Sequence, residues 1–306
     1  RDWLQPVPEP QVRIMFESPS TINWNLTYRC PLDCGHCYSR SRSSDRELSL
    51  DDKVRVAENV VASHVFEVNI GGGEPGLLPE LPGLVSVLSS EHAHINLSAS
   101  GLGISQMQLD LLVAHGLGGL LVSLDSVDPD RHDRLRGAEG CHAAALALAS
   151  AGVARGLKVR FSFVVTRDNL AEVPSVAELA AAMGATSLDV KRLRLAGNGQ
   201  SMGELDLDAS QIADLRSSAV GLAARTLPIR LHLDSGSTTQ AGADCPCGKS
   251  ALTIRDDGAI IACPYNGMTV MGNATIDSIS EVWQANRAVA TRGDALCGAL
   301  GRRKSQ

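Results

Sequence analysis

Three cysteines near the start of the chain form a Cys-x3-Cys-x2-Cys array, made by Cys30, Cys34 and Cys37. The array directly follows a run of alternating apolar and polar residues that is typical of a strand. Cysteine thiolates are the usual protein ligands of iron–sulfur clusters. Three such ligands on a four-iron cluster would leave one iron without a protein ligand, so this iron could bind and activate another molecule.

Zinc binding and thiol redox chemistry are the alternatives for this array. Cys34 and Cys37 have the spacing of many zinc ligands, but His36 lies between them, where it is poorly placed to complete a tetrahedral site. A redox-active Cys-x2-Cys pair would leave Cys30 unexplained. We therefore interpret the array as a cluster site, a hypothesis that needs support from a second motif.

The second motif is a glycine-rich turn, Gly71-Gly72-Gly73-Glu74-Pro75, which follows the next expected strand. Glycine allows a backbone to approach a ligand closely, and a carboxylate can accept hydrogen bonds from an ammonium group. Most glycine turns after strands have no function of their own. This one lies one strand–helix unit after the cysteine array, so each motif supplies the context that the other needs.

Together the two motifs resemble the signature of the radical S-adenosylmethionine (SAM) enzymes. The resemblance implies that the three cysteines hold a 4Fe–4S cluster whose open iron chelates SAM, which is then cleaved to a carbon radical. It also implies that the glycine-rich turn holds the amino group of SAM, and that an aromatic residue, two strand-end serines and an arginine make further contacts. The cofactor-binding residues assigned in this way are Tyr38, Gly72, Gly73, Glu74, Ser98, Ser123 and Arg136.

Three of these assignments have simpler alternatives. Ser98 and Ser123 could cap strand ends, and Arg136 could form a surface ion pair. Radical SAM enzymes often have Ser-Thr-Asn-Gly where this chain has Ser-Ala-Ser-Gly at 98–101, so contacts from the two middle residues are not carried over.

A second cysteine group lies near the end of the chain. Cys247 and Cys263 flank two short expected strands, and an Asp-Gly pair between them suits a hairpin turn that would bring the strand ends together. The spacing Cys-x10-Gly-x4-Cys resembles the opening of a SPASM or twitch domain, which binds an auxiliary iron–sulfur cluster. Cys245 and Cys297 would be further ligands, and a structural zinc at the same four cysteines is the alternative. Cys141, in an alanine-rich helix, is expected to be a small buried apolar residue.

Longer stretches extend the resemblance to the SPASM/twitch subgroup, and in particular to the peptide maturases of the mycofactocin and pyrroloquinoline-quinone pathways. These stretches are 68–75, 122–125, 135–137, 164–169 and 192–194. The subgroup implies oxidative modification of a ribosomally made precursor peptide by crosslinking, dehydrogenation or decarboxylation. The alternatives are a dehydrogenase, epimerase or decarboxylase of a small natural product, such as an aminoglycoside or nucleoside sugar, and a non-enzymatic iron–sulfur or zinc protein.

Partners and location follow from this class and from composition. We expect an electron donor such as a flavodoxin or ferredoxin and, because no peptide-recognition domain precedes the expected barrel, a separate peptide-binding chaperone.

A net charge of −6, without a basic block before the last five residues, argues against nucleic-acid binding. No apolar run is long enough for a membrane span and no signal peptide opens the chain, so we expect no membrane partner. The eight cysteines are clustered and do not suggest a disulfide framework, which favours a cytoplasmic location.

Strands and helices must alternate to position these motifs, and the sequence predicts that they do. Strands are expected at 22–28, 65–70, 95–98, 120–124, 158–165 and 187–193, with helices between them and after the last. This pattern favours an α/β fold, a partial (βα)6 TIM-like barrel, in which functional residues follow the carboxyl ends of the strands. We expect an N-terminal arm over 1–20, the barrel over 21–234, and a small twitch/SPASM-like domain of one β-hairpin and a helix over 235–306.

Overall fold

The computed structural model describes residues 17–39, 46–224, 227–233, 246–265 and 269–290. Within these ranges the strands form one sheet in the order β10-β9-β8-β1-β2-β3-β4-β5-β6-β7. Its main part is parallel and consists of β1 (Thr21–Thr27), β2 (Glu67–Gly72), β3 (His94–Ala99), β4 (Leu117–Ser123), β5 (Lys158–Val165), β6 (Ser187–Arg192) and β7 (Arg230–Leu233). Of the predicted N-terminal arm, only residues 17–20 are described.

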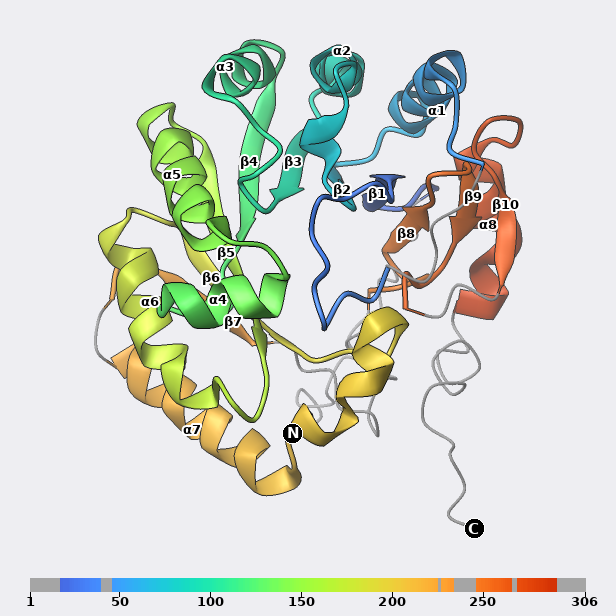
Figure 1. Cartoon of the computed structure of the whole chain (residues 1–306). Coiled ribbons are helices and arrows are strands. Elements are labelled where there is room, and N and C mark those ends of the chain that lie inside the picture. Colours follow the sequence, from blue (N-terminus) through green and yellow to red (C-terminus); the bar gives the residue numbers. More distant parts are fainter. Residues whose placement is uncertain (1–16, 40–45, 225–226, 234–245, 266–268, 291–306) are drawn as a thin grey trace, which may run out of the picture.

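Helices cover the outer, convex face of the curved sheet, as Figure 1 shows. They are α1 (Leu50–Ala62), α2 (Leu81–Leu88), α3 (Gln106–Ala114), α5 (Cys141–Ala154), α6 (Val173–Ala182) and α7 (Ala209–Ala224). This alternation confirms the predicted α/β partial barrel. Within the described ranges, none of the helices combines the length and the apolar character that crossing a membrane requires.

One helix of the barrel, α4 (Pro129–Arg136), is absent from the expected elements. Its polar sequence has no apolar period, so the main sequence signal for a helix is missing. Its ends do carry signals: the Asp128 side chain accepts a hydrogen bond from the Arg131 N–H at 3.0 Å, and Gly137 ends the helix with a φ of 70°. Figure 1 draws α4 inside the ring of outer helices.

The C-terminal strands continue the barrel sheet beyond β1. They are β8 (Ala251–Ile254), β9 (Ala259–Ile261) and β10 (Val270–Asn273), followed by α8 (Ile279–Ala290). β8 runs parallel to β1, with Thr21 opposite Ala251, whereas β9 and β10 are antiparallel to their neighbours. The hairpin and the helix were expected, but the third strand and the pairing with β1 were not. The predicted domain boundaries stay a prediction.

The strands present an apolar face to the outer helices. Trp24 of β1 and Phe161 of β5 are fully buried in one hydrophobic cluster with Val56 and Val60 of α1 and Val176 of α6. Successive side chains of a strand point to opposite faces, so the intervening residues line the inner side of the barrel. There Asn69 Nδ2 donates to Asn23 Oδ1 at 3.2 Å, and Asn96 Nδ2 donates to Asn69 Oδ1 at 3.1 Å. The inner side of β1–β3 is therefore lined by a ladder of amides.

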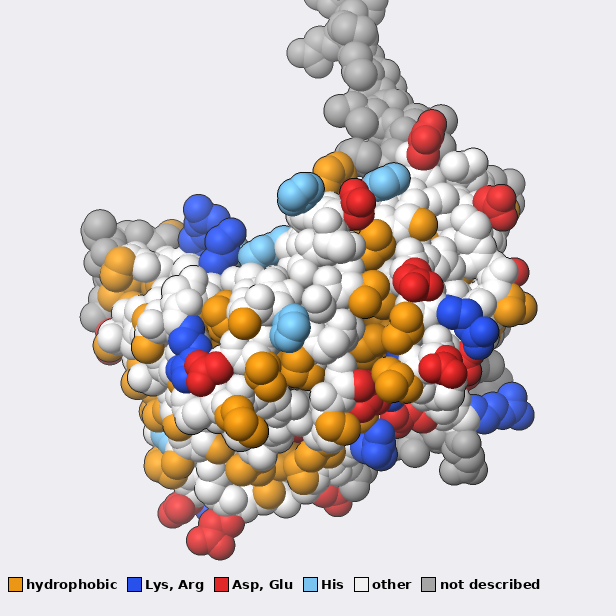
Figure 2. Space-filling view, turned by 90° about the horizontal axis from the view of Figure 1, so that it is seen from above, with side chains coloured by type: hydrophobic (Ala, Val, Ile, Leu, Met, Phe, Trp, Pro, Cys, Tyr) orange, Lys and Arg blue, Asp and Glu red, His pale blue; other side chains and the backbone are white. Residues whose placement is uncertain are grey.

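Several large apolar side chains are exposed. They include Leu77 after the glycine-rich turn, Leu102 after β3, and Met107 and Leu111 of α3. Figure 2, seen from above Figure 1, shows hydrophobic side chains gathered in the middle of the visible face with charged side chains around them. The helical face is thus mixed in character, and the motifs lie on the inner side.

Candidate functional site

The cysteine array lies in the loop that leaves the carboxyl end of β1. Cys34 is buried, whereas Cys30 and Cys37 are partly exposed. Cys141 is fully buried beside them, in a small apolar cluster with Leu32 and Cys34. The loop therefore turns one of its three predicted ligands inward and leaves two closer to the surface.

The end of α4 holds one side of this loop. The Asp33 N–H donates to the Arg136 carbonyl at 3.2 Å, and the Gly35 N–H donates to the Leu135 carbonyl at 3.3 Å. A Cβ at Gly137 would lie 2.8 Å from the Asp33 carbonyl oxygen. Only a glycine after α4 lets the loop approach this closely.

A short 3-10 helix at Gly197–Leu205, after β6, holds the other side. The Asn198 N–H donates to the Cys37 carbonyl at 2.9 Å, and Asn198 Nδ2 donates to the Cys34 carbonyl at 3.0 Å. Gly197 has a φ of 57°, and a Cβ there would lie 2.5 Å from the Cys37 carbonyl oxygen. This contact with the cysteine loop was not predicted from the sequence.

Buried charged and polar side chains lie next to Cys34. Arg136 Nη2 is 2.6 Å from Asp125 Oδ2, and Arg136 Nη1 is 3.9 Å from Cys34 Sγ. His36 Nε2 is 3.4 Å from the same Asp125 oxygen. Arg136 therefore forms a buried ion pair, where a surface ion pair had been the alternative.

Burial and charge act in opposite directions in this group. Burial raises the pKa of the Cys34 thiol to about 11, with partial opposition from the Arg136 charge. Burial would also raise the pKa of Asp125, but the charge of Arg136, together with His36 and the hydrogen bond from the Val164 N–H, lowers it overall. Burial lowers the pKa of His36 to about 4 despite the attraction of Asp125. The Asp125 carboxylate and the Arg136 guanidinium are consequently both charged at neutral pH.

The glycine-rich turn packs against the backbone that leads into Cys30. The Gly73 N–H donates to the Thr27 carbonyl at 2.6 Å, and the Glu74 N–H donates to the Arg29 carbonyl at 2.9 Å. A Cβ at Gly73 would overlap the Arg29 carbonyl, and Gly72 has a φ of 116°. The structure thus brings together the two motifs that the sequence keeps apart.

Glu74 is buried with one carboxylate oxygen unsatisfied. Its Oε2 accepts hydrogen bonds from the Ser100 N–H at 2.9 Å and from the Ser100 hydroxyl, whereas Oε1 has no hydrogen-bond partner among the described residues. Burial raises the pKa of Glu74, and the hydrogen bonds of Ser100 offset this only in part. An unsatisfied buried carboxylate oxygen is costly, so a ligand ammonium fits this position. Ser100 had been assigned no contact, because residues 98–101 depart from the usual radical SAM sequence at their two middle positions.

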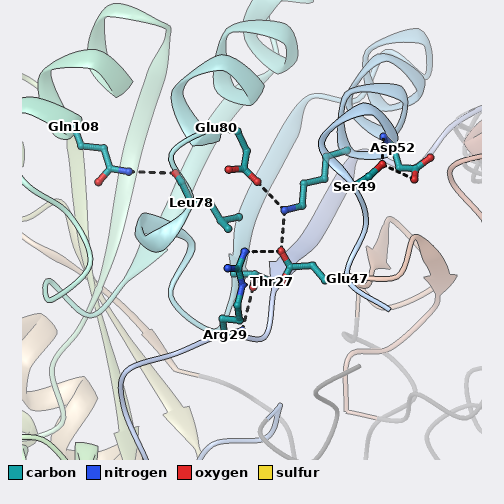
Figure 3. Close-up of polar contacts among 9 residues, drawn as sticks. Thr27, Arg29, Glu47, Ser49, Asp52, Leu78, Glu80 and Gln108 are labelled. Carbon is teal, nitrogen blue, oxygen red and sulfur yellow. Dashed lines mark hydrogen bonds and ion pairs between the residues drawn. The ribbon is translucent and has the colours of Figure 1, made fainter. Parts of the chain in front are cut away.

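A second polar network, centred on the buried Lys53, fixes the surroundings of this turn, as Figure 3 shows. Lys53 Nζ of α1 lies 2.9 Å from Glu47 Oε1 and 2.8 Å from Glu80 Oε1. Glu47 Oε2 accepts hydrogen bonds from Thr27 Oγ1 at 2.7 Å and from Arg29 Nε at 3.1 Å. Burial would raise the pKa of Glu47, but hydrogen bonds from Arg29, Lys53 and Thr27 bring it to about 2. The network ties α1 and the start of α2 to the two residues on which the glycine-rich turn rests.

The remaining predicted contacts of the first motif lie around the same opening. Ser98 is the second-last residue of β3, and its Cβ is 3.7 Å from where a Cβ of Gly71 would lie. Ser123 is the last residue of β4, and both serines are partly exposed. Tyr38 follows Cys37 and stacks edge to face on Tyr265, with ring centroids 4.9 Å apart.

The second cysteine group is described in part. Cys247 lies in a turn before β8 in which the Pro246 carbonyl accepts hydrogen bonds from the N–H groups of residues 249–251. Cys263 is buried just after β9, and Gly258 forms the hairpin turn with a φ of 81°. Cys247 and Cys263 therefore lie at the same end of the hairpin. Cys245 and Cys297 lie outside the described residues.

Aromatic contacts connect the two cysteine groups. Tyr265 comes two residues after Cys263 and packs on Tyr38, which directly follows Cys37. The Arg194 guanidinium lies over the Tyr265 ring, 4.8 Å from its centroid. The hairpin end and the β1 loop thus share one inner surface.

Family models match both regions of the chain. The model of the radical SAM superfamily matches residues 24–180, and that of an iron–sulfur cluster-binding domain, SPASM, matches residues 245–302. The chain belongs to the radical SAM superfamily. As a radical SAM enzyme it uses a 4Fe–4S cluster and SAM, and its SPASM region binds an iron–sulfur cluster.

Individual relatives resemble the chain over most of its length. It is 32% identical over 293 residues to mycofactocin maturase MftC of Mycolicibacterium smegmatis, covering 92% of this chain and 74% of the relative. It is 29% identical over 260 residues to the PqqA peptide cyclase of Ruegeria pomeroyi, covering 80% and 68%. The fold matches Streptococcus suis SuiB bound to the precursor peptide SuiA with a TM-score of 0.76 and 16% identity, covering 95% of this chain and 68% of SuiB.

These matches confirm the predicted enzyme class, its two kinds of cofactor and the SPASM/twitch subgroup. The non-enzymatic alternatives are thereby set aside. The assignment of cofactor contacts to individual residues stays a prediction, although the cysteine loop and the buried Glu74 have the chemistry that the radical SAM cofactors need.

Proposed function

We propose that this radical SAM enzyme oxidatively modifies a ribosomally made precursor peptide by forming a crosslink, dehydrogenating it or decarboxylating it. The observation that carries the proposal is the match to mycofactocin maturase MftC over 92% of the chain, SPASM region included. The PqqA peptide cyclase and the peptide-bound fold of SuiB support the same substrate class. An auxiliary cluster suits oxidation because it can accept an electron from a substrate radical.

We assign the cofactor contacts as follows. Cys30, Cys34 and Cys37 hold the 4Fe–4S cluster, and the auxiliary cluster is held by Cys245, Cys247, Cys263 and Cys297. When bound and reduced, the first cluster supplies the electron that splits SAM into methionine and a 5′-deoxyadenosyl radical. Glu74 accepts the SAM ammonium at its free Oε1, and Ser98, Ser123, Arg136 and Tyr38 lie around the remainder of SAM.

The protein itself contributes positioning. The contacts from Gly137 and Asn198 fix the cysteine loop, and the docking of Gly73 on Arg29 fixes the distance between this loop and Glu74. Fixed geometry of this kind lets a reactive carbon meet one substrate hydrogen while water is kept away. A flavodoxin or ferredoxin would supply electrons, and a separate chaperone would present the peptide.

The test is an anaerobic reaction with a candidate precursor peptide encoded by a short neighbouring reading frame. Reconstituted enzyme should hold about eight irons per chain if both clusters are cubanes. With SAM and dithionite it should release 5′-deoxyadenosine and shift the mass of the peptide, as measured by mass spectrometry. Turnover of SAM with an unchanged peptide, together with conversion of an amino sugar or nucleoside, would replace the peptide with the small-molecule alternative.

A further inference from the structure

The Asp125–Arg136 ion pair is buried directly beside a predicted cluster ligand. Asp125 is 1% exposed and Arg136 is 8% exposed. The guanidinium uses Nη2 for Asp125 Oδ2 at 2.6 Å and turns Nη1 to Cys34 Sγ at 3.9 Å. One full positive charge, paired with one full negative charge, therefore lies beside the Cys34 sulfur in a buried region.

The Asp125 carboxylate is held rigidly in this position. Its Oδ1 accepts a hydrogen bond from the Val164 N–H at 2.9 Å, and its own N–H donates to His132 Nδ1 at 3.1 Å. Asn169 Nδ2 donates to the Asp125 carbonyl at 3.0 Å. The carboxylate is fixed by the ends of β4 and β5, so it in turn fixes the guanidinium against the cysteine loop.

We propose that Arg136 and Asp125 set the reduction potential of the cluster by acting in opposite directions. The inference rests on the proposed function, in which Cys30, Cys34 and Cys37 hold that cluster. One electron from the low-potential donor enters the site on reduction, and no bond forms or breaks, so the site becomes more negative by one charge. A nearby cation stabilises that added charge and a nearby carboxylate destabilises it, and both effects are strong in a site of low dielectric.

The test is a redox titration of the reconstituted full chain without SAM, in which electron paramagnetic resonance measures the reduced cluster. The cluster with the open iron is identified beforehand as the one whose signal changes when SAM is added. Arg136→Gln should reduce the ratio of reduced to oxidised cluster at a fixed potential at least about tenfold, which is about 59 mV for a one-electron couple. Asp125→Asn should raise the same ratio by a similar factor.

Opposite signs separate this role from a structural one. The double variant Asp125→Asn/Arg136→Gln should return to within about threefold of the wild type, since the two charges offset each other. In Arg136→Lys the ratio of reduced to oxidised cluster should stay closer to the wild-type ratio than in Arg136→Gln. As a matched control, Arg155→Gln removes an ion pair with Asp110 on the outer helices and should leave the ratio unchanged.

Three outcomes would overturn the inference. The first is an equal reduction potential in all variants at normal iron content. The second is a shift of the potential in the same direction in both single variants. The third is a double variant whose potential differs from that of the wild type by more than that of either single variant. If Arg136→Gln fails to hold iron, the sign of the Asp125→Asn shift and the position of Arg136→Lys decide. If the wild type itself binds no SAM-responsive cluster, the proposed function fails together with this inference.

Discussion

The two sides of the parallel sheet present different polar surfaces to the inside of the barrel. On β1–β3 the residues are amides that bond one another, Asn23 to Asn69 and Asn69 to Asn96. On β5–β7 they are charged: Arg160 Nη1 lies 3.9 Å from Asp189 Oδ2, and His232 Nδ1 lies 2.9 Å from Asp189 Oδ1. The His232 side chain is also 54% exposed.

The difference shows which side of the barrel is built to stay fixed. Apart from the Glu67 carboxylate, which accepts from Asn96 Nδ2 at 2.7 Å, this ladder consists of neutral amides, and the cysteine loop and the glycine-rich turn leave the same strands at their carboxyl ends. The charged side is more open to solvent, where ion pairs contribute little and can rearrange. We expect β1–β3 and their loops to tolerate little change and β5–β7 to tolerate more, and the following predictions test this.

The largest expected effect is in the cysteine loop. Cys34→Ala should abolish release of 5′-deoxyadenosine from SAM and dithionite, because the cluster would lose a ligand. Cys141→Ala is the matched control, since Cys141 is a fully buried cysteine of the same apolar cluster. It should keep its iron content and SAM cleavage. Equal loss in both variants would mean that packing, not ligation, explains the effect.

Glu74→Gln should weaken SAM binding about 10–100-fold, because a hydrogen bond to a charged group is worth about 1.5–3 kcal/mol. The exchange keeps shape and removes the charge that faces the ammonium. Equilibrium binding to the reconstituted enzyme measures the change. The control is Glu67→Gln, which should bind SAM normally. It replaces a carboxylate that accepts a hydrogen bond from Asn96 Nδ2 at 2.7 Å. An unchanged dissociation constant in Glu74→Gln would remove this residue from the SAM site.

Lys53→Met should lower the free energy of unfolding by about 1.5–3 kcal/mol, since it removes the charged hydrogen bonds that the buried ammonium makes to two partly exposed carboxylates. Urea unfolding followed by circular dichroism measures the change. Arg55→Met removes an exposed ion pair of the same helix and should have no measurable effect. A stability of Lys53→Met equal to that of the wild type would show that the network in Figure 3 is not needed to hold the turn.

The same network predicts a dependence on pH. The pKa of Glu47 is lowered from 4.5 to about 2, so the stability that its contacts provide is complete above about pH 4.5 and is lost as the pH falls towards 2. In Lys53→Met the pKa of Glu47 should be less depressed, and the loss between pH 4.5 and 2 should be shallower. Melting temperatures of both proteins at pH 3 and pH 7 test this. Parallel curves would contradict it.

The smallest effect compares the two sides directly. Asn69→Ala should lower the free energy of unfolding by about 1–3 kcal/mol, because it leaves hydrogen-bond partners in the amide ladder unsatisfied. His232→Ala removes an exposed member of an ion pair and should cost less than about 1 kcal/mol. Urea unfolding of both variants ranks them. A larger loss of stability in His232→Ala than in Asn69→Ala would contradict the proposed difference between the two sides of the barrel.

The strand–helix alternation and both motifs could be predicted because they depend on local sequence. Apolar period, caps and glycine turns are visible within a few residues, and cysteine spacing reflects the loop that it forms. The helix α4 was not predicted, because its sequence is polar and only His132 and Arg136 of its residues are buried. Its importance lies at its end, where Arg136 and Gly137 meet the cysteine loop.

Contacts across the barrel could not be predicted. Nothing near Lys53 in the sequence points to Glu80, and nothing near Cys37 points to Asn198, because these pairs meet only when strands lie side by side. Ser100 shows the same limit at short range: the segment after β3 was recognised, yet which of its side chains reaches Glu74 depends on the exact turn. The registry of β8 with β1 is a third case, since parallel pairing leaves no local sequence signal.

The parallel pairing of β1 has a consequence for biosynthesis. β1 takes one neighbour from residues 67–72 and the other from residues 251–254, so β1 gains its second neighbour only after residues 251–254 have been made. Until then one edge of β1 has unpaired backbone groups, and pairing over such sequence distances is slow. The loop that begins at its carboxyl end acquires its final anchorage late. We therefore expect cluster insertion into this loop to follow the pairing of β8 with β1.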